Sequence, residues 1–229
     1  MLKLIECNVP IWQQLEVEEA LLRVGEGSWC ILNHGSPPAI VLGLSSLLQT
    51  HVDLERVQKQ PIPLIRRFSG GGTVVIDEDT LFFTLILEKE TNPHALMHST
   101  GELLAPAFAP HILCVEEHDF AIQGKKIGGN AQSFCKGRAL HHTSFLWSWK
   151  KELMEYLKIP PHQPLYRRDR SHEEFCGQLS SFFPSKQFFL TKLTEELSHH
   201  FSLERASFLD AQSFLTRPYQ RRLQSLALS

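Results

Sequence analysis

The chain has 229 residues, of which 42% are hydrophobic and 21% charged, so it can bury a core and does not belong to the disordered class. Its formal net charge of −2 argues against a general nucleic-acid binder, and no apolar run approaches the ~20 residues that a membrane-spanning helix needs. Five cysteines, odd in number and without a CxxC pair, indicate reduced thiols in a cytoplasmic protein rather than a zinc or disulfide framework.

The hydrophobic pattern of the first half predicts helices and strands in alternation. A near-continuous apolar run at 80–87 indicates a strand buried on both faces. The other predicted elements are a helix over 13–23 and strands over 29–33 and 39–43 around a turn.

The second half continues the alternation. Two strands over 126–134 and 140–147 are predicted to pair around a turn at Lys136–Gly137. The remaining predictions are a helix over 97–108, short strands over 111–115 and 119–123, a helix over 149–157, an irregular basic stretch over 164–172, and an amphipathic helix over 190–201.

An arginine- and glycine-rich run stands at 66–72, between two apolar stretches that predict an entering and a leaving strand. Glycine lets a ligand approach the main chain, and free backbone N–H groups in such a turn bind anions. Arg66 and Arg67 add positive charge suited to phosphate or carboxylate. The alternative is a glycine-rich hairpin turn, but three glycines beside two arginines and a serine favour an anion-binding loop. The run matches neither a dinucleotide fingerprint nor a P-loop.

A lysine segment follows downstream, with Lys126 close to Gly128 and Gly129. A lysine in reach of an anion-binding loop can hold a phosphate and a carboxylate together. The alternative is a solvated turn lysine, which is the fate of most lysines.

Four motifs in this order resemble the lipoate–protein ligase and biotin–protein ligase superfamily: Arg-Arg-Phe-Ser-Gly-Gly-Gly at 66–72, His-Asp at 118–119, Gly-Lys-Lys-Ile-Gly-Gly at 124–129 and His-His-Thr-Ser at 141–144. The chain is most similar to short lipoate ligases without a C-terminal accessory domain, over residues from about 14 to about 201. The resemblance implies a helix over the polar stretch 47–60. The resemblance implies an α+β fold (mixed α/β): one domain over 1–229 with a mostly antiparallel, mixed sheet flanked by helices, like the class II synthetase-like catalytic domain of these ligases.

The resemblance also implies roles for individual residues. Lys126 would be catalytic and bind the acyl carboxylate and the α-phosphate, in preference to Lys125. Asp119 would lie near the adenylate and Mg²⁺. The residues implied to bind ATP or the acyl-adenylate are Arg67, Ser69, Gly70, Gly71, Gly72, Val75, Asp119, Gly129 and Ala131. Those implied to orient substrate are His118, His142, Thr143 and Ser144, with His141 as a further candidate. Apolar candidates for an acyl tunnel are the strand 80–87, Trp29, Val75, Phe145 and Trp147, although each is more simply explained as part of the core, since apolar residues are mostly buried regardless of ligand.

The implied activity is ATP-dependent ligation of lipoate or octanoate, with Mg²⁺, onto a lysine of a lipoyl carrier domain of a 2-oxoacid dehydrogenase complex or of a glycine-cleavage H protein. A separate accessory-domain protein is a further candidate partner; nucleic acid and membrane are not expected. The sequence departs from the family pattern at three places: His118 replaces Asn, Ile76 replaces His before Asp77, and Thr143-Ser144 replaces Gly-Thr.

Three alternatives stay open. A related branch transfers octanoyl groups without ATP through a cysteine thioester, for which Cys114 is the candidate, although Leu113 and Val115 on either side predict a buried packing thiol. A catalytically silent carrier-binding protein is the second alternative. Biotin ligation is the third and is disfavoured by the glycine motif.

Overall fold

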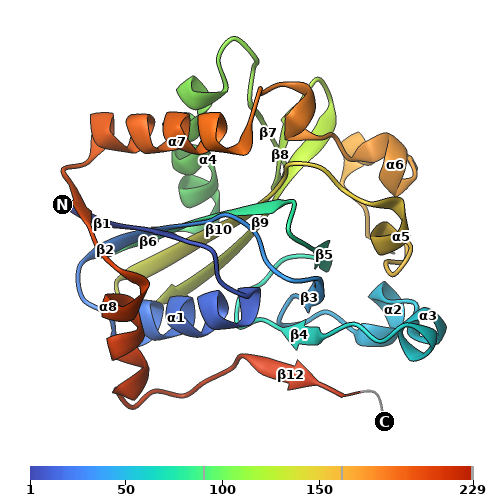
Figure 1. Cartoon of the computed structure of the whole chain (residues 1–229), viewed down its shortest axis with the longest axis horizontal. Helices are drawn as coiled ribbons and strands as arrows, with labels where there is room; N and C mark the ends of the chain where they lie inside the picture. Colours follow the sequence, from blue (N-terminus) through green and yellow to red (C-terminus); the bar gives the residue numbers. More distant parts are fainter. Residues whose placement is uncertain (90, 161, 228–229) are drawn as a thin grey trace.

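The computed structural model describes residues 1–89, 91–160 and 162–227, and it shows a mixed α/β architecture built on two sheets (Figure 1). Within these residues the larger sheet has eight strands in the order β11-β1-β2-β6-β10-β9-β8-β7. Its strands are β1 (Leu2–Cys7), β2 (Ser28–Asn33), β6 (Thr80–Leu87), β7 (Cys114–Glu116), β8 (Asp119–Ile122), β9 (Lys125–Cys135), β10 (Arg138–Leu146) and β11 (Leu203–Arg205).

The smaller sheet has four strands in the order β12-β4-β3-β5. They are β3 (Ala39–Leu42), β4 (Leu64–Arg66), β5 (Val74–Ile76) and β12 (Gln224–Leu226). The α-helices are α1 (Ile11–Val24), α2 (Leu48–His51), α3 (Leu54–Lys59), α4 (Pro93–Leu104), α5 (Lys151–Met154), α6 (His172–Phe175), α7 (Lys186–His200) and α8 (Phe208–Gln212). Short 3₁₀ turns form η1 (Ala105–Phe108), η2 (Leu165–Arg167), η3 (Leu179–Ser181) and η4 (Ser213–Thr216).

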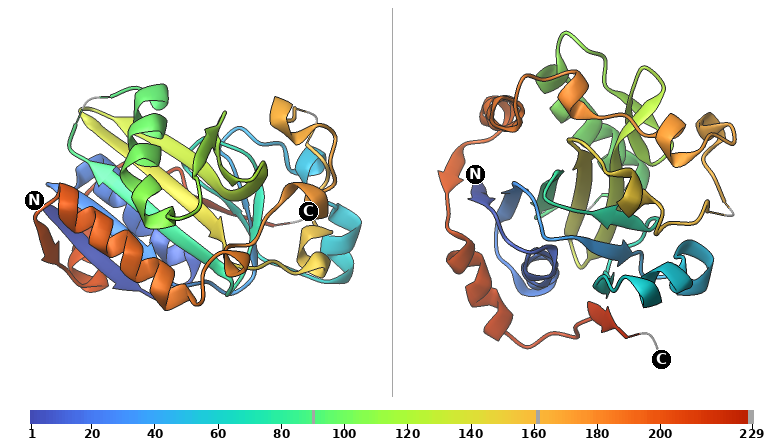
Figure 2. Two further views of the ribbon diagram at one scale, coloured as in Figure 1. Left: turned by 90° about the horizontal axis from the view of Figure 1, so that it is seen from above. Right: turned by 45° about the vertical axis from the view of Figure 1, so that its right-hand side comes forward.

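The buried strand β6 confirms the prediction for 80–87. It pairs antiparallel with both β2 and β10, in the middle of the larger sheet. Helices α4 and α7 cover one face of this sheet and α1 with α8 covers the other (Figures 1 and 2). One core lies on each face: Phe108, Phe145 and Phe189 belong to the first, and Leu21 and Ile86 to the second. Both faces of β6 are therefore removed from water, as its near-continuous apolar sequence predicts.

The predicted pair of strands around Lys136–Gly137 is confirmed as the hairpin β9–β10, with Arg138 opposite Cys135. Lys136 and Gly137 have φ values of +33° and +74°, the positive-φ pattern that a two-residue hairpin turn demands.

The strands predicted on either side of the turn at 35–38 both exist, but they do not pair with each other. β2 lies between β1 and β6 in the larger sheet, so neither of its edges is free. β3 instead pairs with β4 and β5 in the smaller sheet. A turn between two apolar strands can connect strands of different sheets as well as the two strands of a hairpin. Here a hairpin is excluded because both edges of β2 are already paired with other strands.

Several helix predictions needed adjustment. The stretch 47–60 forms two short helices, α2 and α3, interrupted at Val52, which makes an isolated bridge to Leu157. Helix α4 starts earlier than predicted, because the Asn92 side chain caps it by accepting from the Ala95 N–H at 2.9 Å and Pro93 occupies its first turn. The predicted helix over 149–157 shrinks to the four residues of α5. Strands β1 and β11, helix α8 and strand β12 had not been predicted.

No helix among the described residues has both the length and the apolar content required to cross a bilayer.

Candidate active site

The glycine loop, residues 67–73, connects β4 to β5. These two strands do not pair with each other; both pair with β3, β4 parallel and β5 antiparallel. The loop therefore crosses the end of β3, and the hairpin alternative is wrong. Gly43, just after β3, packs directly beneath it, since a Cβ there would lie 2.0 Å from the Gly71 carbonyl oxygen. Only a glycine at this position allows the loop to come so close.

Arg67 holds the loop from inside. Its Nη2 donates to the carbonyl oxygens of Gly70 at 2.9 Å and Gly72 at 2.8 Å. Burial lowers the pKa of Arg67 to about 10, so the guanidinium stays charged at neutral pH. Arg66 points elsewhere and donates to the Ser46 carbonyl at 2.6 Å. Arg67, the arginine expected to bind the ligand, thus makes two hydrogen bonds that shape the loop. It also lines a cavity beside the loop.

The loop leaves backbone donors available. Its carbonyls at Gly70 and Gly72 turn toward Arg67, whereas the N–H groups of Gly71 and Gly72 donate to no acceptor in the described part of the chain. Gly71 has φ +103°, and a Cβ on Gly70 or Gly72 would meet open space. A loop with free amides and no side chains is suited to an oxyanion that approaches the main chain.

Lys126 faces the cavity because of a β-bulge in β9. The β8–β9 register shifts by one residue just after Phe120, so Ile127 is an extra residue on β9. Ile127 is fully buried, and a Cβ on Gly128 would also enter the core, 2.9 Å from a phenylalanine ring. A Cβ on Gly129 would instead lie 3.2 Å from the Lys126 side chain. Because side chains alternate along a regular strand, this extra residue is what brings Lys126 to the same face as Gly129.

Lys126 and Asp119 form an ion pair, with 2.8 Å between Nζ and Oδ1. The second carboxylate oxygen, Oδ2, accepts from the Tyr166 hydroxyl at 2.9 Å. Burial and the charge of Asp119 raise the pKa of Tyr166 far above its ordinary value, so the phenol keeps its proton. From the other side, the Gly177 N–H donates to the Lys126 carbonyl at 2.7 Å. Lys126 is therefore fixed both at its ammonium group and at its backbone.

This ion pair lies where two cavities meet. We call the cavity of about 510 Å³ the first lobe and the cavity of about 380 Å³ the second lobe. The first lobe extends from the glycine loop to Ile11, Leu15 and Phe82 on the α1 side of the sheet and to Met97 on α4. The second lobe is lined by Val75 and Leu146, by Met154 and Leu157 of the segment at α5, and by Arg167 and Phe175. Residues that line both lobes are Gly72, Thr73, Val74, Ile76, Glu117, His118, Asp119, Lys126, Gly129 and Ser144.

The residues expected to form an acyl tunnel do not lie together, and the tunnel itself stays a prediction. Phe82 of the buried strand lines the first lobe and Val75 the second. Trp29 and Phe145 belong to the two cores, where Trp29 packs on Phe214 at 5.9 Å, and Trp147 packs against the core that contains Phe145. Aromatic residues were poor indicators because the cores on both faces use them too.

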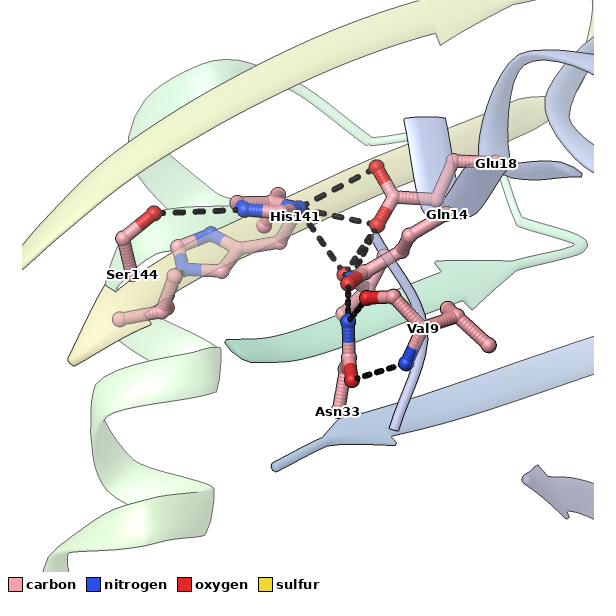
Figure 3. A network of polar contacts seen from close by, with 9 residues as sticks. Val9, Gln14, Glu18, Asn33, His141 and Ser144 are labelled. Atoms are coloured by element: carbon pink, nitrogen blue, oxygen red, sulfur yellow. Dashed lines mark hydrogen bonds and ion pairs between the residues drawn. The ribbon is translucent and has the colours of Figure 1, made fainter. Parts of the chain in front are cut away.

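A buried polar network connects α1 to two residues that line the first lobe, His142 and Ser144 (Figure 3). The Glu18 carboxylate, fully buried on α1, accepts from Gln14 at 2.7 Å and from Thr84 at 2.6 Å. It lies 2.9 Å from His142 Nδ1, and His142 Nε2 lies 3.4 Å from the Ser144 hydroxyl. A carboxylate beside Nδ1 favours the tautomer that carries its proton on Nδ1. The other nitrogen, Nε2, then faces the Ser144 hydroxyl as an acceptor.

The alternation of β10 separates the predicted histidine-motif residues. His142 and Ser144 line the first lobe, whereas His141 and Thr143 face the opposite side of the sheet. There the Thr143 hydroxyl donates to Asn130 Oδ1 at 2.6 Å, and His141 Nε2 lies 3.0 Å from the same oxygen. Burial lowers the pKa of His141 to about 3, so it is neutral. Both residues thus support the sheet and are not placed to orient substrate.

The other predicted residues divide in the same way. Gly70, Gly71, Gly72, Gly129 and Ala131 line the first lobe. His118 lines both lobes despite replacing the expected Asn. Ser69 is only 2% exposed and lines neither lobe, so its hydroxyl is not placed to meet a ligand.

The cysteine prediction is corrected by the structure. Cys114 is exposed, not buried, and lies on the edge strand β7 outside both lobes. Cys176 is the cysteine that lines the second lobe, beside the backbone of Lys126. Burial raises the pKa of Cys176, and Lys126 and Arg167 offset this only in part.

Sequence reasoning missed Glu18, Tyr166 and Cys176. A signal existed for Glu18, which is an acidic residue among the apolar positions of a helix. Tyr166 stood alone in a basic irregular stretch, and its contact with Asp119 spans 47 positions. Nothing in the local sequence indicates such a contact.

Comparison with known proteins gives a consistent result. A family model described as lipoyl protein ligase A/B catalytic domain matches residues 10–202. "Inactive lipoate–protein ligase 2" of Plasmodium falciparum is 28% identical over 218 residues, 76% of this chain and 56% of that protein. Lipoate–protein ligase LplJ of Bacillus subtilis is 27% identical over 177 residues, 74% of this chain and 51% of that protein. The chain thus spans about half the length of the curated relatives it matches.

Among solved structures, a bipartite lipoate protein ligase of Thermoplasma acidophilum, described with its E2 lipoyl domain, superposes with a TM-score of 0.78 at 20% identity, covering 93% of this chain and 89% of that one. A lipoate–protein ligase A bound with ATP gives a TM-score of 0.77 at 20% identity, covering 93% and 91%. At these identities the likeness establishes the fold.

Proposed function

This chain belongs to the lipoyl protein ligase A/B catalytic domain family, and we propose that it is an ATP-dependent lipoate–protein ligase. It activates lipoate or octanoate as the acyl-adenylate and transfers the acyl group to a lysine of a carrier domain. The observation that carries the proposal is the Lys126–Asp119 pair at the junction of two lobes, beside a glycine loop with free amides.

The linings of the lobes suit two different ligands. Part of the first lobe is walled by Ile11, Leu15 and Phe82, an apolar environment for the chain of the acid. The second lobe combines apolar walls with Arg167, which suits a nucleoside with its phosphates. In this arrangement the carboxylate and the α-phosphate meet beside Lys126.

The chemistry requires two anions to react. A carboxylate oxygen attacks the α-phosphorus, the bond to the β-phosphate oxygen breaks, and pyrophosphate leaves. The Lys126 ammonium and the amides of Gly71 and Gly72 would offset the charge that builds up on the phosphoryl oxygens. In the second step a carrier lysine attacks the acyl carbonyl, AMP leaves with the electron pair of the broken bond, and a proton is lost from the amine.

Mg²⁺ is expected with ATP, and the donor set bears on how it binds. Within the described residues, no group of three or more His, Cys, Asp or Glu side chains could hold a metal. Among the described residues, two carboxylates line the lobes and both are already engaged: Asp119 by Lys126 and Tyr166, and Glu117 by the Leu165 N–H. This does not fit the expectation of Asp119 as a ready Mg²⁺ ligand. It fits an ion held chiefly by the phosphate oxygens of ATP.

The test is ATP–pyrophosphate exchange with lipoate or octanoate, followed by mass spectrometry of a lipoyl carrier domain. We expect exchange that depends on the acid, and an acylated carrier lysine. Carrier domains of 2-oxoacid dehydrogenase complexes and the glycine-cleavage H protein serve as acceptors, each with and without a candidate accessory protein. Carrier binding without exchange would favour the catalytically silent alternative, which the name of the Plasmodium relative keeps in view.

Cys176 gives the transferase alternative a specific residue. There the Cys176 thiolate would attack an acyl thioester, release the carrier thiol, and later lose the acyl group to a lysine amine. Its position beside Lys126 favours this reading, while its raised pKa opposes it, because the thiolate is the nucleophile. Mass spectrometry after incubation with octanoyl carrier protein, without ATP, separates the two readings: an acylated Cys176 peptide would support the transferase.

A further inference from the structure

Tyr166 contacts Asp119, one of the residues that line both lobes. It lies in the middle of η2, and the two residues that follow η2, Arg168 and Asp169, have φ values of +53° and +57°. These left-handed conformations turn the chain back sharply. Arg170 then fastens the turn, donating to the Tyr166 carbonyl at 2.8 Å and to the Gly124 carbonyl at 3.0 Å.

The aromatic ring is held independently of the hydroxyl. It packs on Phe175, with 4.9 Å between ring centroids. The guanidinium groups of Arg167 and Arg170 lie over the same Phe175 ring at 4.8 and 5.3 Å. Removing the hydroxyl alone would leave this stack in place, so the hydroxyl has a separable role.

The hydroxyl completes the fixation of Asp119. Oδ1 of Asp119 meets the Lys126 ammonium at 2.8 Å, and Oδ2 accepts from Tyr166 at 2.9 Å. With both oxygens engaged, the carboxylate cannot rotate about its last bond without losing a partner. Lysine is a flexible chain ending in a point charge, so a fixed carboxylate defines where that charge stands.

Neighbouring contacts join η2 to the β7–β8 hairpin, which carries Glu117 and Asp119. The Leu165 N–H donates to the Glu117 carboxylate, directly before Tyr166 meets Asp119. Consecutive residues of η2 thus contact the carboxylates of Glu117 and Asp119, and Arg170 reaches the β8–β9 turn at Gly124. The segment is positioned on the strands that carry the site rather than on the distant core.

We propose that Tyr166 is a positioning residue for acyl-adenylate formation: its hydroxyl fixes the Asp119 carboxylate, which in turn fixes the Lys126 ammonium between the two lobes. This inference rests on the proposed function for its kinetic consequence, but the fixation of Lys126 can be measured without any activity.

The kinetic experiment compares the Tyr166→Phe variant with the unsubstituted protein in ATP–pyrophosphate exchange. We expect kcat to fall about tenfold, with KM for ATP and for the acid changed less than about twofold, because a misplaced charge affects the transition state more than substrate binding. Tyr156→Phe is the matched control, since its hydroxyl donates to the Gln60 carbonyl at 2.9 Å, away from both lobes. That variant should retain wild-type kcat.

A double-mutant cycle tests whether Tyr166 acts through Asp119. In an Asp119→Asn background, Tyr166→Phe should cause no further loss of kcat. Additive losses, a loss confined to KM, or an unchanged kcat in the single variant would each overturn the proposal.

The activity-independent measurement is the rate at which an amine-reactive acetylating reagent modifies Lys126, followed by peptide mass spectrometry. Tyr166→Phe should raise the rate at Lys126 several-fold and leave the exposed Lys125 unchanged as an internal control. If wild-type exchange is absent, the proposed function fails, and the labelling rate still decides the role of Tyr166. Equal labelling of Lys126 in both proteins would overturn the positioning role.

Discussion

Two glycine runs of similar composition serve this site in different ways. At Gly70 and Gly72 an added Cβ would meet open space, so these glycines leave room for something outside the chain. At Gly128 an added Cβ would lie 2.9 Å from Phe145, so that glycine leaves room for the protein's own core. The comparison teaches that a glycine motif marks a ligand site only where the space above it is empty.

The strongest way to break this comparison is at Lys126, which lies between the two runs. Lys126→Ala should lower acyl-adenylate formation by roughly 10²–10³-fold, as expected for one donor aimed at developing charge. The fold should persist, because the ammonium contacts Asp119 in a cavity rather than in a core. The measurement is ATP–pyrophosphate exchange, with Lys125→Ala as the matched control.

Lys125 is exposed and outside both lobes, so its loss should leave the exchange rate within about twofold, as for an ordinary surface substitution. Equal losses in the two variants, or no loss in either, would contradict the assignment of Lys126.

Substitutions at Gly71 and Gly72 distinguish two reasons for a glycine in the loop: a backbone conformation that only glycine adopts easily, and space for a ligand. Gly71 has φ +103°, and its Cβ would lie 2.8 Å from Arg67 Nη2. Gly71→Val should therefore strain the loop by about 1–3 kcal/mol and weaken binding of a non-hydrolysable acyl-adenylate analogue accordingly. Gly72→Ala should leave the melting temperature unchanged but still weaken the analogue, because the methyl group enters the open space. Calorimetric titration and melting curves give both numbers; full affinity in both variants would mean that the loop is only a connection.

The sequence predicted the central strands of the larger sheet, for a physical reason. The buried strand at 80–87 and the hairpin around Lys136–Gly137 depend on local pattern and turn chemistry, which a single sequence carries. The bulge at Ile127 and the contact of Tyr166 with Asp119 depend on pairing between distant segments, which it does not. The same limit explains why Thr143 and Ser69 were expected in the site: motif membership does not tell on which face of a strand a side chain lies.

A substitution at Gly128, in the glycine run on β9, should lower the stability of the fold rather than ligand binding. Gly128→Ala would place a Cβ 2.9 Å from Phe145 and 3.0 Å from the Thr143 methyl group. Overpacking of this kind costs typically about 1–3 kcal/mol in the free energy of unfolding. Denaturant unfolding measures that loss.

Gly129→Ala is the matched control for this variant. Its Cβ would meet only the flexible end of the Lys126 side chain, at 3.2 Å, so it should spare stability while lowering the exchange rate. A stable Gly128→Ala variant would show that the core beside β9 has room to spare.

The smallest effect is expected at Cys114, which lies on the far edge of the same sheet. Its side chain is exposed on β7, so Cys114→Ser removes neither a core contact nor a group lining either lobe. Surface substitutions of this kind usually change the free energy of unfolding by less than about 0.5 kcal/mol, and ATP-dependent ligation should be unaffected. Cys176→Ser, inside the second lobe, is the contrasting variant, because burial there makes a new hydroxyl costly unless it finds a partner. Parallel melting curves and ligation assays test the pair. A loss of ligation in Cys114→Ser, or an acyl group found on Cys114, would place chemistry at the sheet edge, where neither the cavities nor the glycine runs put it.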